Sequence, residues 1–295
     1  MNFFSASFCR YFSFRGLKLL TATLFLLLAG TRAASAGIVV LGELKREYQL
    51  RPGQTHESVI EIENRDATAK KVRIYQTDYR YLSNGESYFP AAGTTERSNA
   101  GWLTFNPKTL TILPMQKSQI RYLLRAPRDL TKKGTYWSML MIQEVPGTAA
   151  AKPDRQESSV LLPAGSNRYG VQIVTQLENT GVIMLEFTKA TVESKNSKRL
   201  LTVDIENRGT RIARPEMWLE VYTGSGVKAG RFVSEQGTIL PGCGVRREID
   251  ISSIPKGTYS SLFIADCGHK DVYGLEIKLV LEGETETKPL PIIKN

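Results

Sequence analysis

Ile60-Glu-Ile-Glu-Asn64-Arg65-Asp66 has a counterpart later in the same chain, Val203-Asp-Ile-Glu-Asn207-Arg208-Gly209, and this pair of stretches decides the fold. Three more pairs follow in the same order: Thr111-Ile-Leu-Pro114 with Thr238-Ile-Leu-Pro241, Lys133-Gly-Thr-Tyr136 with Lys256-Gly-Thr-Tyr259, and Tyr169-Gly-Val-Gln-Ile173 with Tyr273-Gly-Leu-Glu-Ile277. One match could arise by chance, whereas collinear matches indicate a tandem duplication. We therefore expect one structural unit used twice.

Each unit has the sequence pattern of short β-strands separated by turns. Apolar and polar residues alternate with a period of two around Ile60 and Val203, and Asn-Arg-Asp or Asn-Arg-Gly turns follow. The chain after residue 36 shows no long apolar stripe of helical period. Roughly seven short strands per hundred residues are typical of an immunoglobulin-like sandwich. The predicted fold is all-β, with two tandem immunoglobulin-like β-sandwich domains at 37–179 and 180–283 and a tail at 284–295.

The first 36 residues have the pattern of an export signal. Arg10, Arg15 and Lys18 precede the apolar run Leu19–Ala29, and small residues ending in Ala34-Ser-Ala36 follow. A basic region, a short apolar run and an A-x-A site are typical of a cleaved secretory signal peptide. The sequence therefore predicts a signal peptide at 1–36 and a mature protein in the periplasm.

Composition excludes several classes of protein. Of the 295 residues, 41% are hydrophobic and 23% are charged, as in soluble globular domains, and the formal net charge is +10. A positive net charge of this size usually affects solubility and steering and does not indicate nucleic-acid binding. We therefore expect no nucleic-acid partner. The sequence has no G-x-S-x-G elbow, H-E-x-x-H pair or phosphate-binding loop. We therefore expect no enzymatic activity, no small-molecule substrate, no cofactor and no metal.

Two cysteines remain after the signal peptide, Cys243 and Cys267. In a sandwich of this type, their turns are expected at the same end on opposite sheets. Oxidising compartments favour disulfides, so a Cys243–Cys267 disulfide is predicted, which for such a loop contributes about 3 kcal/mol. The alternative is a metal site formed by both cysteines and His269.

The first unit resembles the N-terminal domain of PapD-like periplasmic chaperones, which assemble pili and fimbriae. The resemblance rests on Leu50-Arg-Pro-Gly53, Phe105-Asn-Pro107, Ile112-Leu-Pro114, Gln119-Ile-Arg121-Tyr and the stretch from Met139 to Pro146. It covers about residues 38–178. The chain departs from the family pattern at Lys132-Lys-Gly-Thr-Tyr136, and its second unit looks like a copy of the first. The resemblance therefore points to a divergent member.

Such a resemblance implies that the protein binds and stabilises an exported pilus or surface-fibre subunit by donating a β-strand. The predicted donor strand is Tyr169–Leu177, with one row of side chains presented to the partner: Val171, Ile173, Thr175 and Leu177. Val160 and Leu162, in the preceding loop, could extend this row. The alternative is that all of these side chains belong to the core of the first domain. Participation of an outer-membrane usher stays open.

The resemblance also implies that basic residues between the domains anchor the C-terminal carboxylate of the partner. The candidates by position are Lys45 and Arg46 on the first strand and Arg168 beside the donor strand. The alternative for each is a solvated surface charge. A different function is also open at this stage, that of a structural or adhesive immunoglobulin-like module of a bacterial surface assembly.

Overall fold

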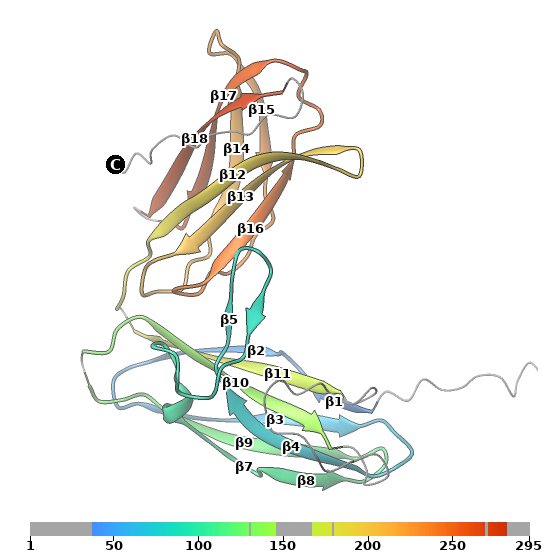
Figure 1. Ribbon diagram of the computed structural model, residues 1–295. Helices are drawn as coiled ribbons and strands as arrows, with labels where there is room; N and C mark the ends of the chain where they lie inside the picture. The colour runs from blue at the N-terminus through green and yellow to red at the C-terminus, as the bar shows by residue number, and fades with distance from the viewer. Residues whose placement is uncertain (1–36, 130, 146–166, 179, 269–270, 282–295) are drawn as a thin grey trace, which may run out of the picture.

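The computed structural model describes residues 37–129, 131–145, 167–178, 180–268 and 271–281. The predicted signal peptide, the loop residues Val160 and Leu162, His269 and the tail lie outside these ranges. The described part is built from β-strands and one short 3₁₀ helix, η1 (Ala100–Trp102), as the sequence predicts. Its strands form two β-sandwiches, one above the other in Figure 1.

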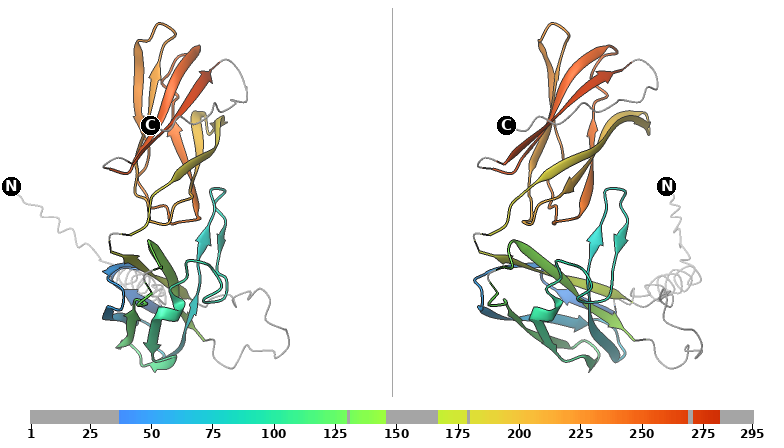
Figure 2. Two further views of the ribbon diagram at one scale, coloured as in Figure 1. Left: turned by 90° about the vertical axis from the view of Figure 1, so that its left-hand side faces the viewer. Right: turned by 60° about the vertical axis from the view of Figure 1, so that its left-hand side comes forward.

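The first sandwich uses the strands from β1 to β11. Its four-stranded sheet has the order β1 (Ile38–Leu41), β3 (Thr55–Asn64), β9 (Lys117–Arg125), β7 (Leu103–Asn106). Its five-stranded sheet has the order β2 (Lys45–Leu50), β11 (Arg168–Leu177), β10 (Thr135–Glu144), β4 (Lys70–Thr77), β8 (Thr109–Ile112). The hairpin β5 (Arg80–Tyr81) and β6 (Ser87–Tyr88) rises from this unit toward the second sandwich (Figure 2).

The second sandwich uses the strands from β12 to β18. One sheet has the order β12 (Leu185–Lys195), β13 (Lys198–Asn207), β16 (Gly244–Asp250). The other has the order β15 (Lys228–Val233), β14 (Glu216–Tyr222), β17 (Thr258–Asp266), β18 (Val272–Val280). Since β11 ends at Leu177 and β12 begins at Leu185, the proposed boundary at 179/180 falls between these strands.

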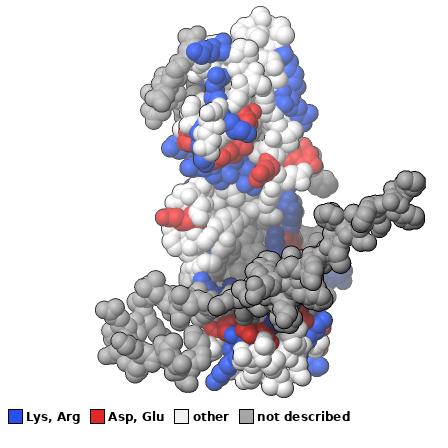
Figure 3. All heavy atoms as spheres, turned by 90° about the vertical axis from the view of Figure 1, so that its right-hand side faces the viewer, with Lys and Arg blue, Asp and Glu red and all other residues white. Residues whose placement is uncertain are grey.

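Each sandwich has its own apolar core because alternate side chains along each central strand point inward. In the first, Ile60 and Ile62 of β3 pack with Ile120 of β9, and all three are buried. In the second, Val203 and Ile205 of β13 occupy the equivalent place. The outer faces carry charges of both signs, paired for example between Arg246 and Asp204 at 2.7 Å. Figure 3 shows both signs intermingled on the second sandwich.

The duplication is visible in hydrogen bonds as well as in sequence. The Asn64 side chain donates to the Ile112 carbonyl at 3.0 Å, and the Asn207 side chain donates to the Ile239 carbonyl at the same distance. In both copies the amide oxygen accepts the N–H two residues later, at 3.0 Å from Asp66 and 2.9 Å from Gly209. The Asn therefore ties the strand that it ends to the Thr-Ile-Leu-Pro turn of its own copy.

The two copies of this turn differ in their surroundings. Leu113 in the first copy is 52% exposed, whereas its counterpart Leu240 is 1% exposed. Leu240 is buried because it packs between the sandwiches, in a cluster that consists of Trp137, Val174, Ile212, Leu240 and Cys243, with Tyr79 and Tyr81 against it. We call this set the interdomain cluster.

Hydrogen bonds across the interface join the same surfaces. The Thr135 backbone N–H donates to the Thr210 carbonyl at 2.9 Å, and the Ile212 N–H donates to the Thr135 hydroxyl at 3.0 Å. The Tyr81 hydroxyl donates to the Thr238 carbonyl and accepts the Leu240 N–H, both at 3.0 Å. The hairpin that carries Tyr81 is therefore fastened to the second sandwich (Figure 1).

The predicted disulfide is wrong in this structure, in which Cys243 and Cys267 are both free thiols. Cys243 is buried in the interdomain cluster, whereas Cys267 packs against the core of the second sandwich. The two side chains therefore pack in different parts of the structure. Burial raises the pKa of both thiols, to about 11 for Cys267, beside which Asp271 and Asp266 also lie.

Candidate partner-binding site

The predicted donor strand corresponds to β11, which is paired on both sides along most of its length. β10 pairs with it antiparallel from Arg168 to Gln176, and β2 pairs with it parallel from Gln172 to Leu177. Both ladders belong to the same chain, so the segment Gln172–Leu177 has no edge left for a partner strand. The expectation of a donor strand over the whole of Tyr169–Leu177 is therefore wrong.

The side chains assigned to the partner lie in the core of the first sandwich. Val171, Ile173 and Leu177 belong to its apolar cluster, and all four predicted residues are buried. The Thr175 hydroxyl accepts a hydrogen bond from the Asn99 side chain at 2.9 Å, inside the same domain. The sequence correctly predicted that these four side chains lie on one face of the strand. That face points into the core, so the alternative of a core role holds for these four residues.

An open edge remains at the beginning of β11. Pairing with β2 starts at Gln172, so no strand of the described part covers Arg168–Val171 on that side. The Gln172 N–H donates to the Leu44 carbonyl at 2.7 Å, toward β2. Since the direction of backbone groups repeats every two residues, the Gly170 N–H points toward the same edge, beyond the end of β2.

This free side ends where β2, the last strand of its sheet, begins to pair with β11. Leu44, just before β2, is 45% exposed although it is apolar. Gly42 makes the preceding turn with φ of 82°, a conformation that favours glycine, and the chain passes there from β1 in one sheet to β2 in the other. We call the free side of Arg168–Val171, which lies in line with β2, the open edge.

The three predicted anchor residues lie in three different places. The Lys45 ammonium is 2.8 Å from the Glu47 carboxylate and 3.1 Å from the Thr238 hydroxyl of the second sandwich, so it lies between the domains. Arg46 donates to the Val59 carbonyl at 2.6 Å, between the two sheets. Arg168 lies over the Phe89 ring at 5.5 Å. Only Lys45 occupies the expected position beside the second sandwich.

Sequence reasoning missed the partners of Lys45. Glu47 also forms an ion pair with Arg214 of the second sandwich. Although burial raises the pKa of Glu47, hydrogen bonds from Lys45 and Arg214 outweigh it and hold the pKa below its usual value. Nearby, a cavity of about 410 Å³ is lined from both sandwiches by residues that include Gln49, Gln176, Arg211 and Arg214. Arg214 is distant in sequence from Lys45, and only the domain arrangement brings them together.

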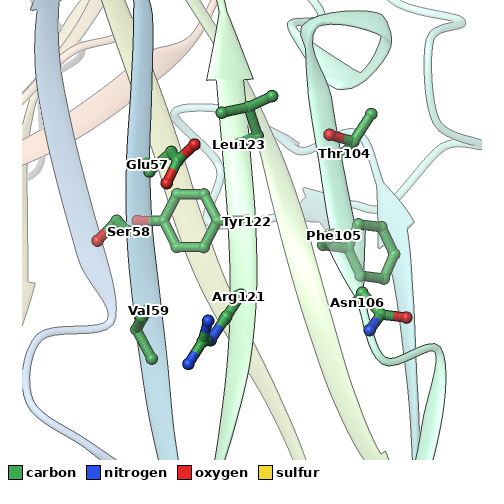
Figure 4. Close-up of a pocket in the computed structure, with 9 residues that line it drawn as sticks. All are labelled: Glu57, Ser58, Val59, Thr104, Phe105, Asn106, Arg121, Tyr122 and Leu123. Atoms are coloured by element: carbon green, nitrogen blue, oxygen red, sulfur yellow. The ribbon is translucent and has the colours of Figure 1, made fainter.

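A second depression lies on the outer face of the four-stranded sheet, away from the open edge. Its volume is about 470 Å³, and its lining comes from β3, β9 and β7 (Figure 4). Arg121 and Glu57 lie on neighbouring strands there, and none of the predicted site residues takes part. Among the described residues, no group of three or more His, Cys, Asp or Glu is placed to hold a metal ion.

Comparisons with known proteins give matches among solved structures. No family model and no curated protein matches the chain. Among solved structures, a chaperone–tip adhesin complex of CFA/I fimbriae biogenesis covers 84% of this chain and 100% of its own, at 14% identity and a TM-score of 0.45. The class 5 fimbriae chaperone CfaA covers 83% and 99%, at 15% identity and a TM-score of 0.44.

A third similar structure is the Salmonella enterica SafA pilin in complex with the SafB chaperone. It covers 83% of this chain and 96% of its own, at 14% identity and a TM-score of 0.35. All three of these structures contain a chaperone. At this level of identity the likeness concerns the fold.

Proposed function

We propose that this protein is a periplasmic chaperone that binds an exported pilus or fimbrial subunit by strand addition at the open edge. The observation that carries the proposal is the segment Arg168–Val171 of β11, which no described strand covers on the side where β2 pairs further along. A long sheet edge with free N–H and C=O groups is a template for a strand from another chain.

The backbone supplies the binding groups in this mechanism. An incoming strand would lie in line with β2, take the Gly170 N–H as a ladder partner and approach the exposed Leu44 side chain just before β2. Hydrogen bonds of this kind set register and orientation, while apolar contacts supply most of the free energy. The side chains of Ile173 and Leu177 stay in the core of the chaperone throughout.

Lys45 is the residue that we propose as anchor for the C-terminal carboxylate of the subunit. It lies at the start of β2, next to the open edge, and its ammonium already contacts one carboxylate, that of Glu47. An incoming carboxylate would share or replace this partner. Location in the periplasm follows from the leader at 1–36, which we propose to be removed on export.

Purification of the tagged protein from periplasm, followed by mass spectrometry, tests the proposal with two variants of one residue. Gly170→Pro removes the outward N–H and places a ring at the edge, without removing a bond to β10. We expect at least about a tenfold loss of bound subunit. Gly170→Ala keeps the N–H and introduces the same contact with Met139, whose terminal methyl would lie 2.5 Å from a Cβ.

The alanine variant is therefore the matched control and is expected to retain the subunit. Hydrogen exchange should show slower exchange of the Gly170 amide in the complex. Equal capture by the proline and alanine variants would contradict strand addition. Co-purification of no exported subunit would count against the chaperone function as a whole.

A further inference from the structure

A second cavity lies between the sandwiches, and it shares no lining residue with the cavity near Arg214. Its volume is about 450 Å³. Its lining comes from the loop before η1, the base of the β5–β6 hairpin and the second sandwich. Figure 2 shows the hairpin beside the second sandwich. The cavity lining contains three arginines, Arg80 and Arg97 from the first sandwich and Arg208 from the second, together with one acid, Glu96.

Two of these guanidinium groups have no acidic partner. Arg80 donates to the Gly242 carbonyl at 3.0 Å, and Arg97 donates to the Lys133 carbonyl at 3.1 Å. The salt bridges within the described ranges include neither residue, whereas Arg208 pairs with Glu186 and Glu206 at 2.7 Å each. Arg97 also lies over the Tyr136 ring at 5.3 Å. Two positive charges without a carboxylate partner therefore line one small space.

The loops that carry the arginines are held rigidly. The buried Asp78 carboxylate accepts the Gly93 N–H at 3.1 Å, the Thr95 N–H at 2.7 Å and the Ser98 hydroxyl at 2.5 Å, which fixes the loop with Arg97. Arg80 follows Asp78 by two residues in the chain. Arg208 lies in the turn that the Asn207 side chain fixes.

Fixed loops reduce the entropic cost of binding, because their backbone needs little further ordering. A guanidinium also presents its N–H groups as a fixed fork that matches carboxylate and phosphate oxygens. The size of the cavity lies within the range of small-ligand sites. The indole N–H of Trp137, which also lines the cavity, is already taken by the Tyr79 carbonyl at 2.7 Å.

We propose that this cavity is a binding site for an oxyanion, a carboxylate or phosphate group, which Arg80 and Arg97 hold, while Arg208 keeps its own acidic partners in the cavity wall. The ligand would join the two sandwiches and stabilise their arrangement. The site uses neither the open edge nor Lys45, so it stands independently of the chaperone function proposed above.

Titration of the protein, without residues 1–36, with inorganic pyrophosphate and separately with a tetraglutamate peptide tests the proposal. The readouts are tryptophan fluorescence, to which Trp137 in the cavity wall contributes, and the melting temperature. We expect saturable binding of at least one probe, weakened by added salt. Binding of pyrophosphate alone identifies a phosphate site, and binding of the peptide alone identifies a carboxylate site.

Substitutions of the lining residues should change the binding affinity in defined directions. Arg80→Gln and Arg97→Gln should each weaken binding about 3- to 10-fold, a range that allows for solvent screening. Glu96→Gln should strengthen it, because the only acid in the lining is removed. Arg125→Gln, at an exposed position on β9, is the matched control and should leave binding unchanged.

Arg80 is exposed and tests the site even if Arg97→Gln lowers stability through its loop. The melting temperature of each unliganded variant shows whether it is folded. The absence of saturable binding of both probes would overturn the proposal, as would unchanged affinity in folded Arg80→Gln. A Glu96→Gln variant that binds more weakly would also contradict it.

Discussion

At the scale of single residues, a buried asparagine defines each repeat. Asn64 and Asn207 are fully buried, yet their side-chain amides find backbone partners in the turn that follows and in the Thr-Ile-Leu-Pro turn. Asparagine suits this place because its side chain is both donor and acceptor. No apolar residue of similar size could satisfy the same carbonyl and N–H groups.

Replacing either asparagine by alanine should lower the free energy of unfolding by about 1–3 kcal/mol, because buried carbonyl and N–H groups lose their partner. Urea denaturation followed by tryptophan fluorescence measures the change. Asn84→Ala is the control, since the exposed Asn84 side chain donates only to Glu86. Similar effects of all three substitutions would show that the buried network contributes no more than a surface contact.

The cysteines give a second prediction at this scale. With its pKa at about 11, roughly one Cys267 thiol in a thousand is ionised at pH 8, and Cys243 is buried. Thiol reagents should therefore react slowly with the native protein and label two thiols after denaturation without reductant, in protein lacking residues 1–36. Labelling of none after denaturation would show a disulfide and contradict the structure.

At the scale of elements, the sequence predicted where the strands lie better than it predicted what each strand pairs with and packs against. The period of two correctly placed Val171, Ile173, Thr175 and Leu177 on one face of β11. Periodicity alone does not tell whether that face meets the core or a partner, because apolar side chains suit both. The parallel pairing of β2 with β11 joins residues more than a hundred positions apart, and no local pattern signals it.

The core role of β11 predicts the effect of substitution. Ile173→Ala should cost about 2–5 kcal/mol of stability, because Ile173 is buried among neighbours that cannot fill the space. Val182→Ala, at a position that is 63% exposed, should change stability by less than about 0.5 kcal/mol. Thermal or urea unfolding measures both. A fully stable Ile173→Ala variant would return this side chain to the candidates for partner contact.

At the scale of the whole molecule, the interdomain cluster joins the sandwiches into one body. The sequence showed two units but not their contact, since Tyr81, Trp137 and Leu240 belong to separate motifs that only the fold brings together. The same holds for the anchor residues. Lys45 was found from its position in a family pattern, whereas its neighbours Glu47 and Arg214 needed the domain arrangement.

Tyr81→Phe should weaken the coupling between the sandwiches. The substitution removes the hydroxyl that bonds to Thr238 and Leu240 and should cost about 1–2 kcal/mol. Calorimetry should show a lower or broader transition, and the Leu240 amide should exchange faster. Tyr88→Phe is the matched control because the Tyr88 hydroxyl contacts only Glu86 of its own hairpin. Equal behaviour of the two variants would rule out a clamping role for Tyr81.

The unequal burial of Leu113 and Leu240 limits how far the ancestral duplication could be repeated. Both copies contain the Thr-Ile-Leu-Pro turn, but only the first copy has the apolar surface of Trp137 and Val174 against which Leu240 of the second copy packs. In the second copy, the matching positions hold Ser260 and Lys278, which are exposed. A third unit appended in the same way would place its leucine against Ser260 and Lys278, and it would therefore lack the apolar contact that joins the first two units.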